Sequence, residues 1–101
     1  MEGRATQKNE FEICGRILDL IPPQYINETL SKATLIMQVW AGRRENQVSF
    51  DFFNDRMKIL DGFKKDDWVI LSFQLKGKRV QTKDGKIMYF NSLEGLNCIK
   101  G

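Results

Sequence analysis

The chain has 101 residues, of which 42% are hydrophobic and 29% are charged, with a net charge of +3 at pH 7. This length predicts one domain with a single hydrophobic core and excludes a multidomain protein. The chain has no histidine, and its two cysteines, Cys14 and Cys98, are far apart in the sequence. A zinc site is therefore not expected, and no other motif calls for a cofactor.

The N-terminal segment "MEGRATQKNE" has no apolar run, and no later segment is long and apolar enough to cross a membrane. We therefore expect a cytoplasmic protein with reduced cysteines and no membrane contact. Residues 1–9 are polar and predict a flexible N-terminal arm, and residues 10–101 are expected to form the domain.

The first predicted strand begins at Phe11, where apolar and polar residues alternate as far as Ile17. Gly15 interrupts this strand and indicates a bend or bulge of the kind a small barrel needs. Pro22-Pro23 is expected to end the strand, because proline cannot donate a ladder hydrogen bond. Residues 24–31 are then a polar connection.

Two further strands are predicted at 32–41 and 47–54, joined by a turn at 42–46. Their alternation places one set of apolar side chains in the core: Leu35, Met37, Val39, Val48, Phe50 and Phe52. The opposite set, which includes Ile36, Trp40 and Phe53, then lies on the outside.

The spacing of apolar residues changes from strand-like to helical after the third strand. Asn54 or Asp55 is expected to cap a short helix there, which ends at Gly62. A fourth strand follows at 66–75, with Val69, Leu71, Phe73 and Leu75 in phase. The basic segment "KGKRVQTKDGK" contains the tight-turn signal Asp84-Gly85 and predicts a hairpin. A fifth strand covers 87–99.

Five short strands with a helix between the third and fourth predict an all-β protein. The order is that of the OB-fold, a partly open Greek-key barrel. An SH3-like barrel is the main alternative, but it does not normally carry a helix at that position.

Four segments resemble a family of small single-OB-fold proteins of Bacteroides-type bacteria and their phages, described as a domain of unknown function or as single-stranded DNA-binding-protein-like. These segments are "EICGRILDLIPPQ", "FFNDRMKILDGF", "DDWVILSFQLKGKR" and "KIMYFNSLEGL". The resemblance covers about residues 10–99 and implies an OB-fold that binds single-stranded nucleic acid. It also implies the bacterial cytoplasm as the location, or the host cytoplasm if a phage encodes the protein. The acidic and apolar tail of bacterial replicative relatives is not found before the final "NCIKG", so recruitment through such a tail is not expected.

Aromatic side chains on the outer face of the barrel are candidate platforms for base stacking. The predicted phase puts Trp40 and Phe53 on that face, with Ile36 beside them. Tyr25 lies in the connection after the first strand, and ordinary packing explains it equally well. Tyr89 and Phe90 fall on opposite faces of the fifth strand, so one of them is expected in the core, and Tyr89 is included among the candidate nucleic-acid-binding residues. Trp68 is expected to be structural or to lie at an interface.

Basic residues gather at two predicted turns, where they could contact a phosphodiester backbone. They are Arg43, Arg44, Lys76, Lys78, Arg79, Lys83 and Lys86. The hairpin alone carries five of these cations against one acid, Asp84, so the rest of the chain is slightly acidic. A lysine-rich solvated edge is the alternative. Asp51 on the proposed face is unfavourable to phosphate unless it is paired.

No constellation of residues indicates an enzyme. The preferred interpretation is a sequence-independent single-stranded DNA-binding protein that supports replication, recombination or repair and acts as a homo-oligomer, with replication or recombination proteins as further partners. A protein–protein interaction module with an aromatic interface is the alternative. Single-stranded RNA stays open as a third, because no residue identifies a 2′-hydroxyl reader.

Overall fold

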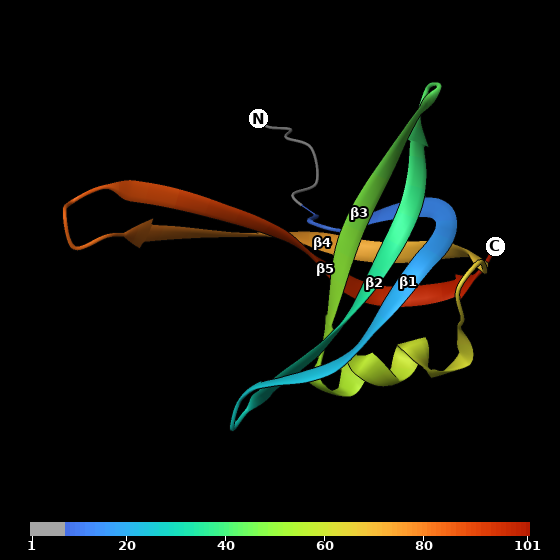
Figure 1. Cartoon of the computed structure of the whole chain (residues 1–101), viewed down its shortest axis with the longest axis horizontal. Coiled ribbons are helices and arrows are strands. Elements are labelled where there is room, and N and C mark those ends of the chain that lie inside the picture. The colour runs from blue at the N-terminus through green and yellow to red at the C-terminus, as the bar shows by residue number, and fades with distance from the viewer. Residues whose placement is uncertain (1–7) are drawn as a thin grey trace.

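The computed structural model describes residues 8–101, which form five strands and one short helix. The elements are β1 (Phe11–Asn27), β2 (Leu30–Ala41), β3 (Arg44–Phe53), a 3-10 helix η1 (Asn54–Gly62), β4 (Trp68–Gln81) and β5 (Ile87–Lys100). The strands close a barrel in the order β1-β2-β3-β5-β4. The predicted five-stranded barrel, with a helix between the third and fourth strands, is confirmed (Figure 1).

Alternating apolar residues of all five strands fill the barrel. On β2 and β3 the predicted inward set is confirmed, apart from Val48, which is only half-buried. The core consists of Ile17, Ala33, Leu35, Met37, Val39, Phe50, Phe52, Leu60, Val69, Leu71 and Cys98.

Strand β1 is shared between two neighbours, and this closes the barrel. Its first residues pair with β4 and its later residues pair with β2, so that Arg16 lies in register with both Trp68 and Gln38. Gly15 is buried at this corner, where a Cβ would lie 2.5 Å from the Gln38 carbonyl oxygen and 2.7 Å from Met37. The predicted bend at Gly15 therefore has a steric cause, because no larger residue fits between the strands.

The barrel is nearly open between β3 and β5. These strands are parallel and share one paired position, Asp51 with Glu94. The ring of Phe52 occupies the space beside Gly95, within 2.3 Å of where a Cβ would stand. Glycine at this position lets a large core side chain fill the gap that the missing ladder leaves.

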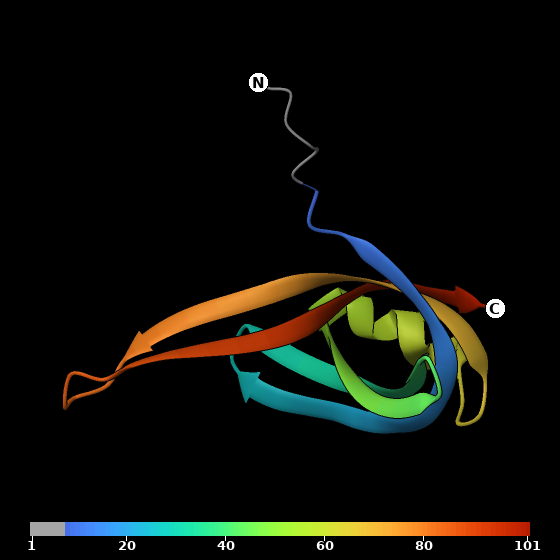
Figure 2. The same ribbon diagram turned by 90° about the horizontal axis from the view of Figure 1, so that it is seen from above.

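The helix lies across one end of the barrel (Figure 2). Leu60 is buried, and Met57 and Ile59 pack against the core. The predicted capping by Asn54 or Asp55 is wrong, because the N-cap is Phe53 and no side chain caps the helix. Asn54 has a left-handed backbone (φ 50°). Its side chain instead accepts from the Ser31 N–H (2.9 Å) and donates to the Thr29 carbonyl (3.2 Å).

The prediction that Pro22-Pro23 ends the first strand is wrong. The ladder between β1 and β2 shifts register between Ile21 and Gln24 and then continues to Asn27. The two prolines fall inside this irregularity, where no regular ladder donor is required. Residues 24–31, predicted as a loop, consequently form most of a hairpin.

Three hairpins leave the barrel in different directions (Figure 1). They join β1 to β2, β2 to β3, and β4 to β5. The prediction for residues 1–9 falls mostly on positions outside the described part of the chain. Within residues 8–101, no helix is long and apolar enough to cross a membrane.

Candidate nucleic-acid interface

The longest projection is the hairpin formed by Leu75–Leu93, which we call the arm. Its strands pair from Leu75 with Leu93 out to Gln81 with Ile87. The tip is ordered by Thr82, whose N–H donates to the Lys86 carbonyl (2.8 Å) and whose hydroxyl accepts from the Lys86 N–H (3.1 Å). Gly85 supplies the left-handed turn position (φ 84°). The predicted tight turn is thus confirmed, and the basic segment is a defined ribbon.

The two faces of the arm each combine a cation with an aromatic ring. Residues paired across an antiparallel ladder project from the same face. Lys78 pairs with Phe90, and Arg79 pairs with Tyr89, so the two pairs occupy opposite faces. Tyr89 is 71% exposed and Phe90 is 52% exposed. The prediction that one of these rings is in the core is therefore wrong, because both residues lie in the arm, before β5 enters the barrel.

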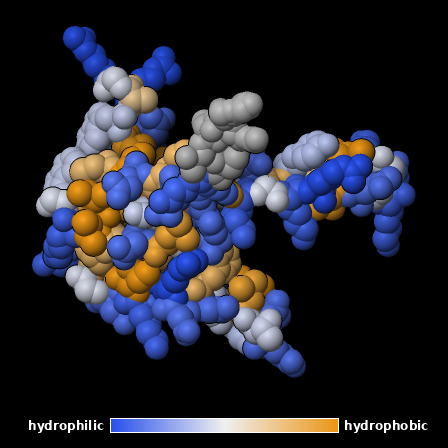
Figure 3. Space-filling view, turned by 180° about the vertical axis from the view of Figure 1, so that it is seen from behind, coloured by the Kyte–Doolittle hydropathy of each residue, from blue (hydrophilic) through white to orange (hydrophobic). Residues whose placement is uncertain are grey.

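Apolar side chains follow the arm far beyond the core. Leu75, predicted to be in phase with the core, is 51% exposed because the arm begins there. Ile87 and Met88 are also exposed. Figure 3 shows the arm standing apart from the barrel, with hydrophobic atoms between hydrophilic ones.

A shallow hollow of about 390 Å³ lies on the arm next to the barrel. It is lined by Lys76, Gly77, Lys78, Phe90, Asn91 and Ser92. A Cβ at Gly77 would have only the Asn91 amide oxygen near it, at 3.6 Å. The missing side chain at Gly77 therefore leaves room for a flat group beside Asn91, on the face of the arm that also carries Arg79 and Tyr89.

The cations of the arm differ in how far they are neutralised. The Lys76 ammonium lies 3.3 Å from the Glu94 carboxylate, which also accepts from Arg56 at 3.3 Å. Within residues 8–101, the other four cations of the arm form no ion pair: Lys78, Arg79, Lys83 and Lys86. Their charge is available to an anionic partner.

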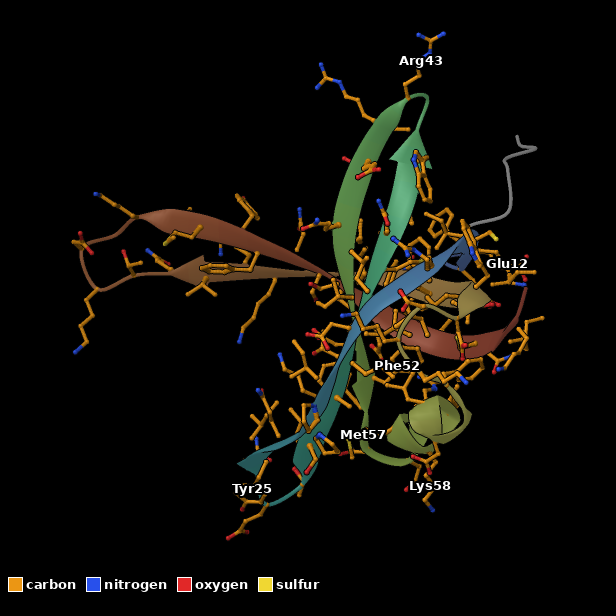
Figure 4. All side chains as sticks on the ribbon, turned by 45° about the vertical axis from the view of Figure 1, so that its right-hand side comes forward. Glu12, Tyr25, Arg43, Phe52, Met57 and Lys58 are labelled. Carbon is orange, nitrogen blue, oxygen red and sulfur yellow. The ribbon has the colours of Figure 1, made fainter. Side chains whose placement is uncertain are left out.

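The hairpin between β2 and β3 carries the second basic group. Gly42 makes the turn with a left-handed backbone (φ 64°), Arg43 stands at its tip (Figure 4), and Arg44 begins β3 opposite Ala41. Trp40 is 46% exposed on β2 just before this tip. Its ladder partner is Glu45, so the hairpin is not uniformly positive.

Trp40 and Phe53 lie on the same outer face but do not form one platform. Trp40 pairs with Glu45 and Phe53 pairs with Lys32, which places them eight residues apart along β2. That spacing corresponds to about 26 Å of strand. Phe53 is half-buried beside Leu30, Lys76 and Glu94, at the base of the arm. Ile36 lies between the two aromatics and is also half-buried.

The carboxylate of Asp51 is paired on the outer face. The Thr34 hydroxyl donates to it at 2.8 Å, and the Lys32 ammonium lies 3.8 Å away. Only 19% of the Asp51 side chain is exposed. Its repulsion of a passing phosphate is therefore reduced.

Tyr25 is near the tip of the hairpin between β1 and β2 and is 74% exposed (Figure 4). This hairpin leaves the barrel in a different direction from the arm, so Tyr25 lies apart from the residues of the arm (Figures 1 and 4). The hydrogen bonds of Asn54 to Ser31 and Thr29 fasten the turn of this hairpin to the start of the helix.

Of the exposed aromatics that were not among the site residues expected from the sequence, two lie beside predicted site residues. One is Phe90, opposite Lys78. The other is Trp68, which is 50% exposed and stacks on Trp40 with a centroid distance of 5.8 Å and an interplanar angle of 12°. Strand alternation alone could not reveal this stack, because the two tryptophans come from strands that are not sheet neighbours.

The turn before Trp68 is held by Asp67. The Lys64 N–H donates to its carboxylate (3.0 Å) and lowers the pKa of Asp67, and the Lys100 ammonium at 3.3 Å acts in the same direction. Burial, with the Asp67 charge nearby, raises the pKa of the Cys98 thiol to about 11. No cluster of three or more potential metal ligands occurs among residues 8–101.

Residues 12–98 match the family described as "Domain of unknown function (DUF3127)". The match covers most of the sequence, and the chain belongs to this family. A search of curated proteins finds no match.

Solved structures with the same fold include two single-stranded DNA-binding proteins. The mitochondrial protein Rim1 of S. cerevisiae aligns with a TM-score of 0.69 at 15% identity, over 90% of this chain and 92% of that one. The Plasmodium falciparum SSB, solved in complex with single-stranded DNA, aligns with a TM-score of 0.62 at 13% identity, over 94% and 92%. At these identities the similarity establishes the OB-fold of the chain.

Proposed function

We propose that this DUF3127 member binds single-stranded DNA with little sequence preference. The observation that carries the proposal is the arm, where each face has an exposed aromatic ring directly opposite a cation. The rings can stack on unpaired bases, and the cations can neutralise the adjacent phosphates. Stacking accepts every base, because every base has a π-face, so the arrangement selects unpaired strands and not a sequence.

Electrostatics would draw the strand to the arm first. Four of its cations have no ion-pair partner among residues 8–101, so counterion release can contribute to binding. The paired state of Asp51 reduces repulsion on the neighbouring barrel face. Phe53, at the base of the arm, offers a further apolar contact. Neither a metal nor a cofactor is required for this chemistry.

Beyond Lys32, which lies 3.8 Å from Asp51, Arg43 and Arg44 are the next cations along the outer face of β2 and β3. A strand that leaves the arm and follows this face would reach them together with Trp40. Supporting or protecting unpaired strands in replication, recombination or repair fits such a binder. Replication or recombination proteins would then be its partners.

Association between copies is supported by a separate surface. Cys14, Ile70 and Ile99 are in register across β1, β4 and β5, and their ladder neighbours Gly15, Val69 and Leu71 face the core. The row is therefore directed outward, and Cys14 and Ile99 are exposed. We propose that a second copy covers this apolar row, since one OB domain spans few nucleotides.

The binding proposal is tested by fluorescence anisotropy of a labelled oligo-dT, titrated with the full chain at low and moderate salt. Duplex DNA and oligo-U are added as competitors. We expect salt-sensitive binding that duplex fails to compete. Absence of binding at tens of micromolar protein and low salt would contradict the proposal. Stronger competition by oligo-U than by unlabelled oligo-dT would assign the site to RNA.

A further inference from the structure

We propose that the stacked pair Trp40–Trp68 is a second base-stacking site, separate from the arm and occupied by a distant nucleotide of the same single strand. The inference rests on the proposed function and extends the proposed binding surface from the arm to the tryptophan pair. It also assigns a ligand contact to Trp68.

The pair spans three strands. Trp40 is on β2 and Trp68 is the first residue of β4, while β1 runs between them. Their rings are nearly parallel, with an interplanar angle of 12°, and about half of each side chain remains in water. Each indole covers part of the other, so a base added to the outer side would extend a stack that already exists.

The rings stand on a fixed support. Arg16, in register with Trp68, donates to the Gln38 amide oxygen (2.7 Å) and to Asp66 (3.3 Å). The Gly101 N–H donates to the Trp68 carbonyl (2.9 Å). The preceding turn is tied to β1, because the Asp66 N–H donates to the Ile17 carbonyl and the Ile17 N–H donates to the Asp67 carbonyl, each at 2.8 Å. Such a platform loses little conformational freedom when a base binds.

Core packing does not account for the exposed ring surface. The barrel interior is filled by other residues, and Trp40 and Trp68 belong to the outward-facing set, since their neighbours Val39 and Val69 are buried. Two large aromatics left half in water beside a partly exposed arginine match the chemistry of a stacking platform with a cation at its edge.

The pair is remote from the arm. Lys78, which faces Phe90, is ten residues beyond Trp68 on β4. That is about 33 Å of strand. At the 3.4 Å spacing of stacked nucleotides, roughly ten nucleotides are needed to reach from one site to the other. An oligonucleotide of about 15 nucleotides can therefore occupy both sites, which is within the range covered by single OB domains.

The chain contains only these two tryptophans, so its indole fluorescence reports on this site alone. The experiment titrates the full chain with oligo-dT of roughly 15 nucleotides, following labelled-oligonucleotide anisotropy and, with unlabelled oligonucleotide, tryptophan emission. We expect emission to be quenched in step with anisotropy. Trp68→Leu should weaken binding roughly 5- to 140-fold, the equivalent of one lost stacked base.

Two variants make the result specific. Trp68→Phe keeps a ring and should retain affinity within a few-fold, which separates stacking from a general loss of structure. Phe11→Leu changes another exposed aromatic, one that lies against Phe73 at 5.7 Å, and should leave affinity unchanged. Circular dichroism melting confirms that each variant is folded.

The outcomes separate this inference from the proposed function. Binding by anisotropy with unchanged tryptophan emission at saturation would overturn the stacking site and leave the arm as the binding element. Unchanged affinity of folded Trp68→Leu would overturn it as well. No binding by anisotropy would reject both proposals.

Discussion

The barrel and the arm are built from the same two strands, β4 and β5, yet they place apolar residues in opposite environments. In the barrel half of β4, Val69 and Leu71 are completely buried. In the arm half, Leu75, Tyr89 and Phe90 are more than half exposed. The difference is the second layer of strands, which the barrel has and the arm lacks.

A two-stranded ribbon is only marginally stable in water without further packing. Burial accounts for the apolar residues of the barrel, whereas the large rings of the arm stay in water and gain no stabilisation from burial. Apolar residues in the arm are therefore better explained by contact with a partner than by the stability of the fold. The predictions that follow separate these two explanations.

The largest expected effect is in the barrel. Phe52→Ala removes a fully buried ring that fills the space beside Gly95 in the gap between β3 and β5. We expect the free energy of unfolding to fall by about 3–5 kcal/mol. Urea unfolding followed by circular dichroism measures this loss. A decrease below about 1 kcal/mol would mean that the core is not closed by this ring.

The complementary change is in the arm. Tyr89→Ala with Phe90→Ala removes two exposed rings and should alter the free energy of unfolding by no more than about 0.5 kcal/mol for each ring. Binding of oligo-dT should weaken by about 1–3 kcal/mol for each stacked base that is lost. Anisotropy and urea unfolding on the same preparation compare the two effects. A double variant that unfolds easily but binds oligo-dT normally would show that the two rings stabilise the fold and do not bind the strand.

The barrel and its surface also differ at the two cysteines. Cys14 is exposed, whereas Cys98 is buried and its thiol has a pKa of about 11. At about pH 8, roughly one part in a thousand of Cys98 is thiolate, the reactive form. We expect iodoacetamide, at a dilution where copies of the chain are separate, to modify Cys14 first and Cys98 only after unfolding, as read by peptide mass spectrometry. Equal rates in the folded protein would contradict this core assignment.

Much of the barrel was predictable because strand alternation records which side faces the core. The inward set on β2 and β3, the bend at Gly15 and the helix after β3 all follow from local pattern. Strand ends were less predictable. Pro22-Pro23 indicates a stop, but a register shift carries the ladder past it.

The candidate site was predictable only in part. The cations of the arm and Trp40 could be identified from charge and phase. Exposure of both Tyr89 and Phe90 could not, because alternation assumes that the core extends as far as these residues. The one available signal is length, since β4 and β5 each have 14 residues, more than a small barrel needs. The Trp40–Trp68 stack depends on barrel closure and leaves no local trace.

Contact between the arm and the phosphates of the strand is best tested by the salt dependence of oligo-dT binding. The variant Lys83→Glu with Lys86→Glu is compared with Lys58→Glu with Lys65→Glu. The second pair makes the same change in net charge on exposed residues outside the arm (Figure 4 shows Lys58 on the helix).

For single strands, the slope of log affinity against log salt is about −0.7 per phosphate contact. We predict that reversal of Lys83 and Lys86 makes the slope shallower by about 1.4, two contacts, and lowers affinity alike for all sequences. The Lys58 and Lys65 pair should leave the slope nearly unchanged. Equal effects of the two pairs, or an unchanged slope in both, would show that the arm is a solvated edge and not a clamp for single-stranded DNA.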